Sequence, residues 1–401
     1  MVRIFYKNHF SIYKKEITRF VVIILLTAIS IALVTAIGVL PSQIRVASET
    51  LTSEWLINYA NFIADGIERI SYIFPVMFII VSAMVVFMTL TRLIEKDRTQ
   101  IGCMVTLGYS KLQVSSKYLI FTLSSNIIGS IIGILIGAYL INPVLFDAIA
   151  RQVRLSDAPF YIPYMGIIFS VILIGLMFLV TLITTQNVLN QQPSEIIRGK
   201  AIKIKDKSIL EKLPFWSLLP YKYKSTTRNI FRYKIRLVMT LFSVSLSTIL
   251  VFAGFSLMFV LNETNPEMND VIGMISLIIV VAAVLLDTLV IYNITNINID
   301  ERKKEIATLK VLGYKEIEVA GYIFREIMII VLLGITIGLP LGYGSMHFIF
   351  EFLNFGNIEY LRWYVWIISG IITLVSLGLA VLFLFNKIRK VNMNDSLKVL
   401  E

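Results

Sequence analysis

The chain has 401 residues, of which 57% are hydrophobic and only 16% are charged. Soluble domains carry about 25% charged residues, so this composition excludes a soluble enzyme and a disordered chain. Lysine and arginine number 37 against 26 aspartate and glutamate residues, a net charge of +11. One cysteine and two histidines are too few for a disulfide framework or a His/Cys metal site, and we expect no cofactor.

Eight long runs with few or no charges follow one another along the chain. About 20 apolar residues cross a hydrocarbon core of about 30 Å, and each run is at least that long. The runs are 20–44, 70–91, 118–146, 161–183, 237–262, 271–298, 327–350 and 363–386. We therefore predict an all-α integral membrane protein with eight transmembrane helices. The first run is too long for the core of a signal peptide, so we interpret it as a retained span.

Basic residues concentrate on one side of the predicted spans. With the N-terminus in the cytoplasm, the inner segments hold 32 of the 37 lysines and arginines, and the outer connections hold five. The positive-inside rule therefore predicts a multi-pass protein of the plasma membrane with both termini in the cytoplasm. Membrane topology and contact with anionic lipid account for the positive net charge. We therefore expect this protein to interact with the lipid bilayer and not with nucleic acid.

One sequence pattern occurs twice, at an offset of 205 residues. Ile101–Ser110 matches Ile306–Lys315 through a shared Leu-Gly-Tyr, and two glycine triplets superpose at the same offset. Arg19 and Arg236, which open spans one and five, pair at an offset of 217. Each half has an even number of spans, so the halves share one orientation. We therefore predict two parallel four-helix repeats.

The duplication divides the chain into five parts. We expect a cytoplasmic amphipathic helix over 1–19, a first repeat over 20–186, a basic cytoplasmic linker with an elbow helix over 187–236, a second repeat over 237–386, and a cytoplasmic tail over 387–401. The linker contains Pro193, Pro214 and Pro220, which interrupt any long helix there.

In each half, a charged cluster leads into a short amphipathic stretch at the predicted inner surface. Gly108 and Gly313 follow these stretches, where a glycine would end a short helix. Such a segment could dock a cytoplasmic partner, or it could only anchor the bundle at the interface, and both readings stay open. The duplication favours a partner that is itself present in two copies.

Two further groups of residues lie within the predicted spans. Glycines spaced by four residues share one helix face and let helices approach closely in lipid, so we predict a packing role over a pore-lining one. They are Gly129, Gly133, Gly137, Gly334, Gly338 and Gly342. Asp287 is the only acid within a span. We favour a hydrogen-bonded role for Asp287, near Tyr292 and Asn293, over a proton relay or a substrate contact.

Catalytic motifs are missing from the sequence. It contains no G-x-x-x-x-G-K-[ST] loop for nucleotide phosphates, no H-E-x-x-H pair and no Ser/His/Asp constellation. We therefore expect no ATP hydrolysis on this chain. Any energy-coupled activity would use an ion gradient or a partner.

The repeated pattern resembles a known family of membrane proteins. The second copy, from Tyr292 through Gly342, and the first, from Phe74 through Gly137, are similar to FtsX-like (MacB-type) ABC-transporter permeases. The resemblance implies a permease subunit without catalytic residues, which couples ATP hydrolysis on separate cytoplasmic ABC ATPase subunits to export or to mechanical transmission. Two halves in one chain would serve two ATPase copies.

In the family, the loop between the second and third helices of each half holds a coupling helix that contacts the ATPase. Carried over to this chain, the candidate coupling residues are Arg98, Gln100, Thr106, Leu107, Gly108, Tyr109, Arg302, Glu305, Lys310, Leu312, Gly313 and Tyr314. These residues fall on the two segments that their own pattern marks as docking candidates.

The outer connections depart from the family pattern. Family members insert large extracytoplasmic domains where this chain has only 41–71 and 262–270. We expect one amphipathic helix around Trp55–Ile70 in the first connection and a tight turn in the second. An extracytoplasmic or accessory membrane protein is a further partner that this pattern allows.

Two other functions remain as alternatives. A secondary transporter with parallel repeats would need an ionisable residue in the membrane, and Asp287 is its one candidate. A non-transporting membrane scaffold would carry the same docking segments.

Overall fold

The computed structural model describes residues 16–155, 161–191, 234–264, 269–353 and 358–391, together with residues 12, 13, 224, 226 and 230. Within this part of the chain there are helices and connections but no strand. Eight of the described helical segments are long and apolar enough to cross a membrane, and each falls on one of the predicted runs. The prediction of an all-α membrane protein with eight spans is therefore confirmed.

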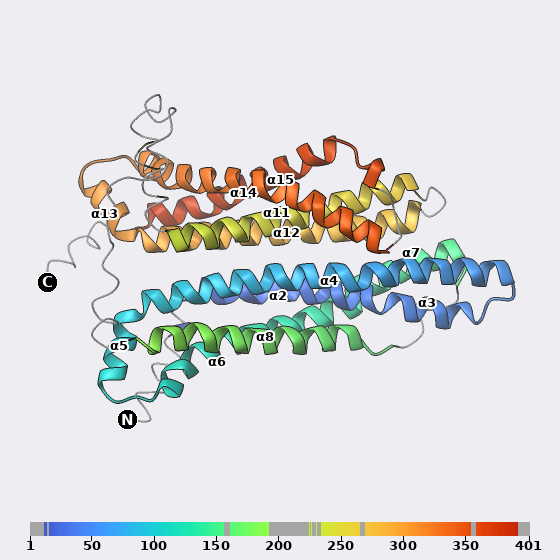
Figure 1. Cartoon of the computed structure of the whole chain (residues 1–401), viewed down its shortest axis with the longest axis horizontal. Helices are drawn as coiled ribbons and strands as arrows, with labels where there is room; N and C mark the ends of the chain where they lie inside the picture. The colour runs from blue at the N-terminus through green and yellow to red at the C-terminus, as the bar shows by residue number, and fades with distance from the viewer. Residues whose placement is uncertain are drawn as a thin grey trace.

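The first four spans form one half of the molecule (Figure 1). They are α2 (Ile17–Gly38), α4 (Glu54–Lys96), α6 (Lys111–Ile136) and α8 (Tyr164–Leu189). The short helices of this half are α3 (Leu40–Ser48), which follows α2, α5 (Arg98–Thr106), which follows α4, and α7 (Asn142–Val153). A turn of π-helix, η1 (Gly137–Ile141), joins α6 to α7 in one continuous helical segment.

The second half contains the corresponding long helices. They are α11 (Lys234–Thr264), α12 (Asn269–Glu301), α14 (Glu316–Leu353) and α15 (Tyr364–Arg389), with α13 (Lys303–Val311) and the 3₁₀ turn η5 (Ile358–Tyr360) between them. The short helices α5 and α13 lie at the same end of the bundle, and α3 and α7 lie at the other (Figure 1). These are called the α5/α13 end and the α3/α7 end below.

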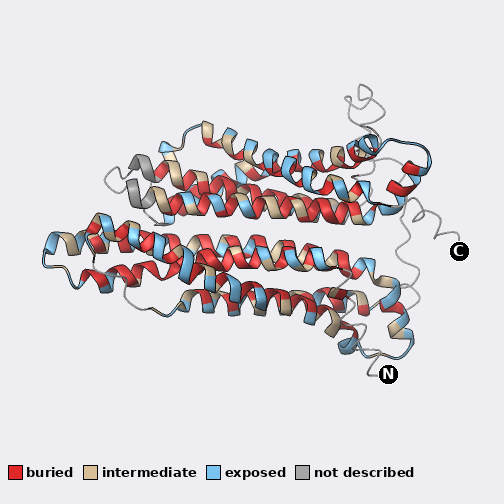
Figure 2. Ribbon diagram, turned by 180° about the vertical axis from the view of Figure 1, so that it is seen from behind, coloured by how far each residue is buried: buried red, intermediate tan, exposed pale blue. Residues whose placement is uncertain are grey.

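Four central helices, α2, α4, α11 and α12, join the two halves through contacts of α4 with α11 and of α12 with α2 and α4. In their most apolar stretches 56–72% of the residues are buried, against 28–39% in α6, α8, α14 and α15. Buried residues accordingly concentrate along the middle of the bundle in Figure 2. One apolar core, which includes Phe78 of α4 and Phe252 of α11, contains residues of both halves. The peripheral helices expose apolar side chains outward, as lipid contact requires.

Helix α4 is much longer than a bilayer requires. Its 43 residues span about 64 Å at about 1.5 Å per residue, which is twice the hydrocarbon thickness. Its first turns pack against α3 and α7 beyond the apolar run. Arg45 of α3 holds this hairpin by ion pairs to Asp65 at 2.7 Å and Glu68 at 2.5 Å.

The amphipathic helix expected around Trp55–Ile70 is present, but it is continuous with the span that follows. Ile63, Ile67, Ile70 and Phe74 are all buried, at helical spacing across the expected boundary. One buried stripe therefore favours one uninterrupted helix.

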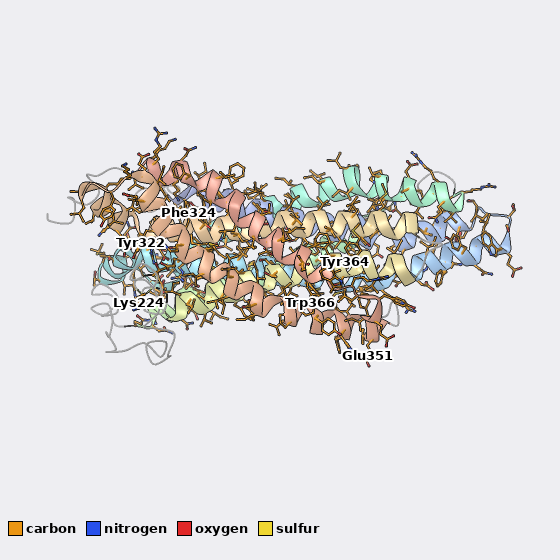
Figure 3. The ribbon with its side chains drawn as sticks, turned by 90° about the horizontal axis from the view of Figure 1, so that it is seen from above. Lys224, Tyr322, Phe324, Glu351, Tyr364 and Trp366 are labelled. Carbon is orange, nitrogen blue, oxygen red and sulfur yellow. The ribbon has the colours of Figure 1, made fainter. Side chains whose placement is uncertain are left out.

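Aromatic side chains fasten the start of α15 to α11 near the α3/α7 end. The ring centroids of Trp366 and Phe252 lie 5.3 Å apart, and those of Tyr364 and Phe259 lie 5.0 Å apart. Figure 3 labels Tyr364 and Trp366 in the first turn of α15, and Glu351 near the end of α14. Of the tight turn expected over 262–270, residues 262–264 and 269–270 belong to α11 and α12, and residues 265–268 between them lie outside the described residues.

Candidate docking site

Two nine-residue helices, α5 and α13, each follow a long central helix. They end just before Gly108 and Gly313, and both glycines have φ of +87°, a conformation that side chains with a Cβ rarely adopt. In each case the N–H of the following tyrosine bonds the carbonyl five residues back, at 3.1 Å. Each short helix therefore ends at the glycine that the sequence indicates.

Large apolar side chains are exposed around each glycine. Leu107 and Leu112 are 76% and 71% exposed, and Leu312 and Ile317, 205 residues later, are 68% and 75% exposed. We call Leu107, Tyr109 and Leu112 the first patch, and Leu312, Tyr314 and Ile317 the second patch. Exposed apolar groups gathered in this way are typical of an interaction surface.

Leu112 and Ile317 are not among the coupling residues expected from the sequence. Both lie just after the expected coupling segments, at the starts of α6 and α14. The signal was nevertheless present, because both residues are large and apolar and obey the 205-residue offset.

The twelve candidate coupling residues differ in exposure. Those exposed are Gln100, Thr106, Leu107, Gly108, Glu305, Leu312, Gly313 and Tyr314, and those half-buried are Arg98 and Tyr109. Arg302 and Lys310 are only 4% and 8% exposed. Their charges therefore act within the protein, where they hold α13 in place.

An ion pair ties each short helix to the long helix that follows it. Before α5, Asp97 accepts hydrogen bonds from Lys117 at 2.9 Å and Tyr118 at 3.1 Å on α6. Before α13, Arg302 pairs with Glu326 on α14. In both halves an ion pair thus joins the residue before the short helix to the next long helix. The residue before the short helix is the acid in the first half and the base in the second.

Lys310 connects α13 to the last span. Its ammonium donates hydrogen bonds to the carbonyls of Ile388 and Arg389, both at 2.9 Å, and of Val391 at 3.1 Å. The last carbonyls of a helix have no i+4 partner within it, although Ile388 also accepts from the N–H of Val391 at 3.3 Å, and the helix dipole favours a cation there. Lys310 therefore stabilises the end of α15 and attaches it to α13.

The first half makes the corresponding connection with other residues. Lys111, at the start of α6, donates a hydrogen bond to Asn190 at 2.7 Å, and Arg98 bonds Gln191. Asn190 and Gln191 directly follow α8. The segment around each short helix is therefore fastened to the fourth span of its own half.

The glycine triplets face helices α2 and α11. A Cβ at Gly133 would lie 2.7 Å from the carbonyl oxygen of Ala28, and a Cβ at Gly338 would lie 2.9 Å from that of Ser245. Both distances are shorter than van der Waals contact, so only glycine permits these approaches. Gly129, Gly137 and Gly334 also face α2 or α11 at distances that leave no room for a side chain, and a Cβ at Gly342 would lie 3.0 Å from the ring of Phe252 on α11, a tight contact.

Asp287 is fully buried on α12, where its Oδ1 lies 2.7 Å from the hydroxyl of Ser247 on α11. The first half has a corresponding contact, because Ser30 and Ser82 lie 2.7 Å apart between α2 and α4. Ser30 and Ser247 obey the 217-residue offset, and Ser82 and Asp287 obey the 205-residue offset. One interhelical hydrogen bond is thus made in both halves, with a carboxylate in only one of them.

Several expected regions lie largely or wholly outside the described residues. They are most of the amphipathic helix over 1–19, most of the linker and elbow over 187–236, and most of the tail over 387–401.

Comparison with known proteins identifies the family. The FtsX-like permease C-terminal family model matches residues 72–193 and 276–393, which together make up more than half of the chain. Each matched segment contains one of the two short helices, one docking patch and one glycine triplet. Neither the curated proteins nor the solved structures include a match to this chain. On these matches, the protein belongs to the FtsX-like permease family and has the role of an ABC-transporter permease.

Proposed function

We propose that this permease couples ATP hydrolysis on two separate ATPase subunits to export or to mechanical transmission across the plasma membrane. The ATPases bind the first and second patches, so the α5/α13 end lies in the cytoplasm together with both termini. The two halves act as parallel four-helix repeats.

The observation that carries this proposal is the repeated exposed patch. Leu107 and Leu112 recur as Leu312 and Ile317 at one end of the bundle, all more than two-thirds exposed. Apolar side chains of this size on a polar end of the protein favour a docked partner. Two patches fit a partner with two copies.

The contacts around α5 and α13 supply a route for motion. Each short helix is joined to the long helices before and after it in the chain, and its segment is fastened to the fourth span through Asn190 and Gln191 or through Lys310. A displacement of either short helix by an ATPase would therefore move three spans of that half. At the α3/α7 end, the hairpin formed by α3 and the start of α4 extends beyond the apolar run of α4.

The alternatives predict different behaviour. A secondary transporter depends on Asp287, but the first half makes the same contact with Ser82 and no acid. A scaffold would bind the ATPase without changing its activity, so stimulation of ATP hydrolysis separates a transporter from a scaffold.

The test is binding and stimulation of a partner ABC ATPase, with the purified permease in lipid vesicles. Leu107→Glu and Leu312→Glu together place a charge in each patch. We expect them to weaken ATPase binding at least tenfold, or about 1.4 kcal/mol, because desolvating a carboxylate in an apolar contact is costly.

Val46→Glu is the matched control, because Val46 is a 52% exposed apolar residue at the α3/α7 end. It should leave binding and stimulation unchanged. Undiminished ATPase binding by the Leu107→Glu/Leu312→Glu protein would overturn the proposed docking site.

A further inference from the structure

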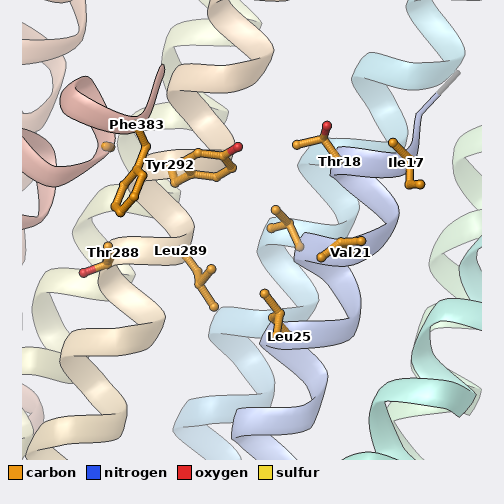
Figure 4. A pocket seen from close by; sticks show the side chains of 10 residues that line it. Ile17, Thr18, Val21, Leu25, Thr288, Leu289, Tyr292 and Phe383 are labelled. Atoms are coloured by element: carbon orange, nitrogen blue, oxygen red, sulfur yellow. The ribbon is translucent and has the colours of Figure 1, made fainter. Parts of the chain in front are cut away.

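An apolar groove of about 550 Å³ separates α2 from α12 and α15 (Figure 4). Val21 and Leu25 line it on α2, and Leu289, Tyr292 and Phe383 line it on the opposite side. All of these residues belong to membrane-spanning helices. In a bilayer the groove therefore opens sideways toward lipid, at the boundary between the two halves.

The groove follows the direction of the spans. Its lining on α2 runs from Ile17 to Leu25, which is about 12 Å at about 1.5 Å per residue. One leaflet of hydrocarbon is about 15 Å thick, half of the core. The groove therefore spans most of the depth of the leaflet at the α5/α13 end and can hold most of one acyl chain.

A cluster of charges lies next to the groove at that end. It contains Glu16, Arg19, Lys96, Asp300, Lys303 and Lys387, and we call it the ionic roof. Lys387 lies one helical turn beyond Phe383, and Asn296, which accepts a hydrogen bond from Lys387, lies one turn beyond Tyr292. The lining residue Thr18 directly precedes Arg19.

The ionic roof has more cations than carboxylates. Glu16 pairs with Arg19 at 3.0 Å and with Lys96. Asp300 pairs with Arg19 at 3.4 Å, with Lys303 at 3.1 Å and with Lys387 at 2.7 Å.

Two carboxylates thus serve four cations, an excess of two positive charges. The neighbouring group of Arg92 with Glu95 and Glu301 offsets only one of them. Among the described residues, the balance at this end of the groove is therefore positive.

Buried hydrogen-bond donors in and beside the roof also lack acceptors. Arg19 is 2% exposed and Asn296 is 1% exposed. Within the described part of the chain, neither Arg19 Nε nor Asn296 Nδ2 has a hydrogen-bond partner. Buried N–H groups are normally paired, so hydrogen-bonding capacity is left over in this positively charged region.

We propose that the groove and its ionic roof form a binding site for one anionic phospholipid of the membrane. The acyl chain occupies the groove, and the phosphate pairs with the half-exposed cations of the roof, Lys96 and Lys303. The site joins α2 of one half to α12 and α15 of the other, so the lipid stabilises this arrangement of the halves. This proposal goes beyond the proposed function and requires no ATPase.

The test is native mass spectrometry of the whole purified chain in detergent, titrated with dioleoylphosphatidylglycerol or dioleoylphosphatidylcholine. We expect one phosphatidylglycerol to bind at least tenfold more tightly than phosphatidylcholine. Val21→Trp, which fills the groove, should weaken phosphatidylglycerol binding at least fivefold. Val238→Trp is the matched control, because Val238 is the exposed counterpart of Val21 on α11 and does not line this groove.

A second pair of variants tests the headgroup contact and does not depend on Val21→Trp folding. Lys303→Gln removes a half-exposed cation of the roof, and Lys304→Gln removes its exposed neighbour outside the roof. The first should reduce the preference for phosphatidylglycerol at least threefold, and the second should leave it unchanged. Equal binding of the two lipids by the wild type, or equal effects within either pair, would overturn the proposal.

Discussion

The role of the fully buried Asp287 follows from comparison with the corresponding contact in the first half. Ser247 and Asp287 join α11 to α12, and Ser30 and Ser82 join α2 to α4 at the same distance of 2.7 Å. Since the first half maintains this contact with two hydroxyl groups, a negative charge is not required for it. We interpret Asp287 as one partner of a structural hydrogen bond between helices.

Replacing Asp287 by serine should therefore be tolerated. The Asp287→Ser protein reproduces the serine pair of the first half, so we expect its free energy of unfolding to change by no more than about 1.5 kcal/mol, the worth of one hydrogen bond. Thermal unfolding in detergent measures this change, and ATPase stimulation should stay within twofold of the wild type. A folded but inactive Asp287→Ser protein would instead favour a proton-relay role.

At the scale of elements, the two short helices are attached to their surroundings by different chemistry. Lys310 of α13 is buried against the last carbonyls of α15, whereas Val105 occupies the corresponding position of α5. The first half relies on Lys111 and Arg98 at its more exposed surface. We therefore expect α13 and α15 to be coupled more rigidly to each other than α5 and α8 are.

Lys310→Met tests this attachment because it keeps an unbranched side chain but removes the ammonium. Three carbonyl contacts are lost, which should destabilise the last turn of α15 by about 1–3 kcal/mol. Hydrogen exchange of the amides around 384–391 should become at least about fivefold faster. Lys304→Met, at an exposed position of the same helix, serves as the control. Unchanged exchange in the Lys310→Met protein would show that the cap does not hold α15.

At the scale of the whole molecule, the two ends of the bundle differ in charge and in shape. The α5/α13 end carries the basic segments, the ionic roof and the two patches, and the α3/α7 end carries the projecting hairpin (Figure 1). The positive-inside rule then predicts that the first end faces the cytoplasm.

The only cysteine of the sequence allows a direct test of this orientation. Cys103 lies exposed on α5. A membrane-impermeant maleimide should leave Cys103 unlabelled in intact cells and label it in inverted membranes or after solubilisation. In a Cys103→Ser background, Thr52→Cys in the turn before α4 should be labelled in intact cells. Labelling of Cys103 in intact cells would contradict this orientation and place the α5/α13 end outside the cell.

Much of the fold could be predicted because its signals are local. The length of each apolar run determines a span, and Gly108 and Gly313 determine where α5 and α13 end, since few other residues adopt φ of +87°. The 205-residue offset placed two equivalent segments in the two halves. The expected boundary between the amphipathic helix at Trp55–Ile70 and the second span does not exist, because the buried stripe continues from Ile63 into the span and no single residue interrupts it.

The sequence by itself determined the class of protein, its eight spans and the segments most suited to docking. Only the tertiary structure decided that Arg302 and Lys310 face inward, and that Arg19 meets Asp300 at a separation of 281 residues. The groove and the unpaired donors beside it likewise arise where helices of different halves meet. The physical reason is that hydropathy and helix ends depend on neighbouring residues, whereas burial, ion pairing and cavities depend on which helices pack together.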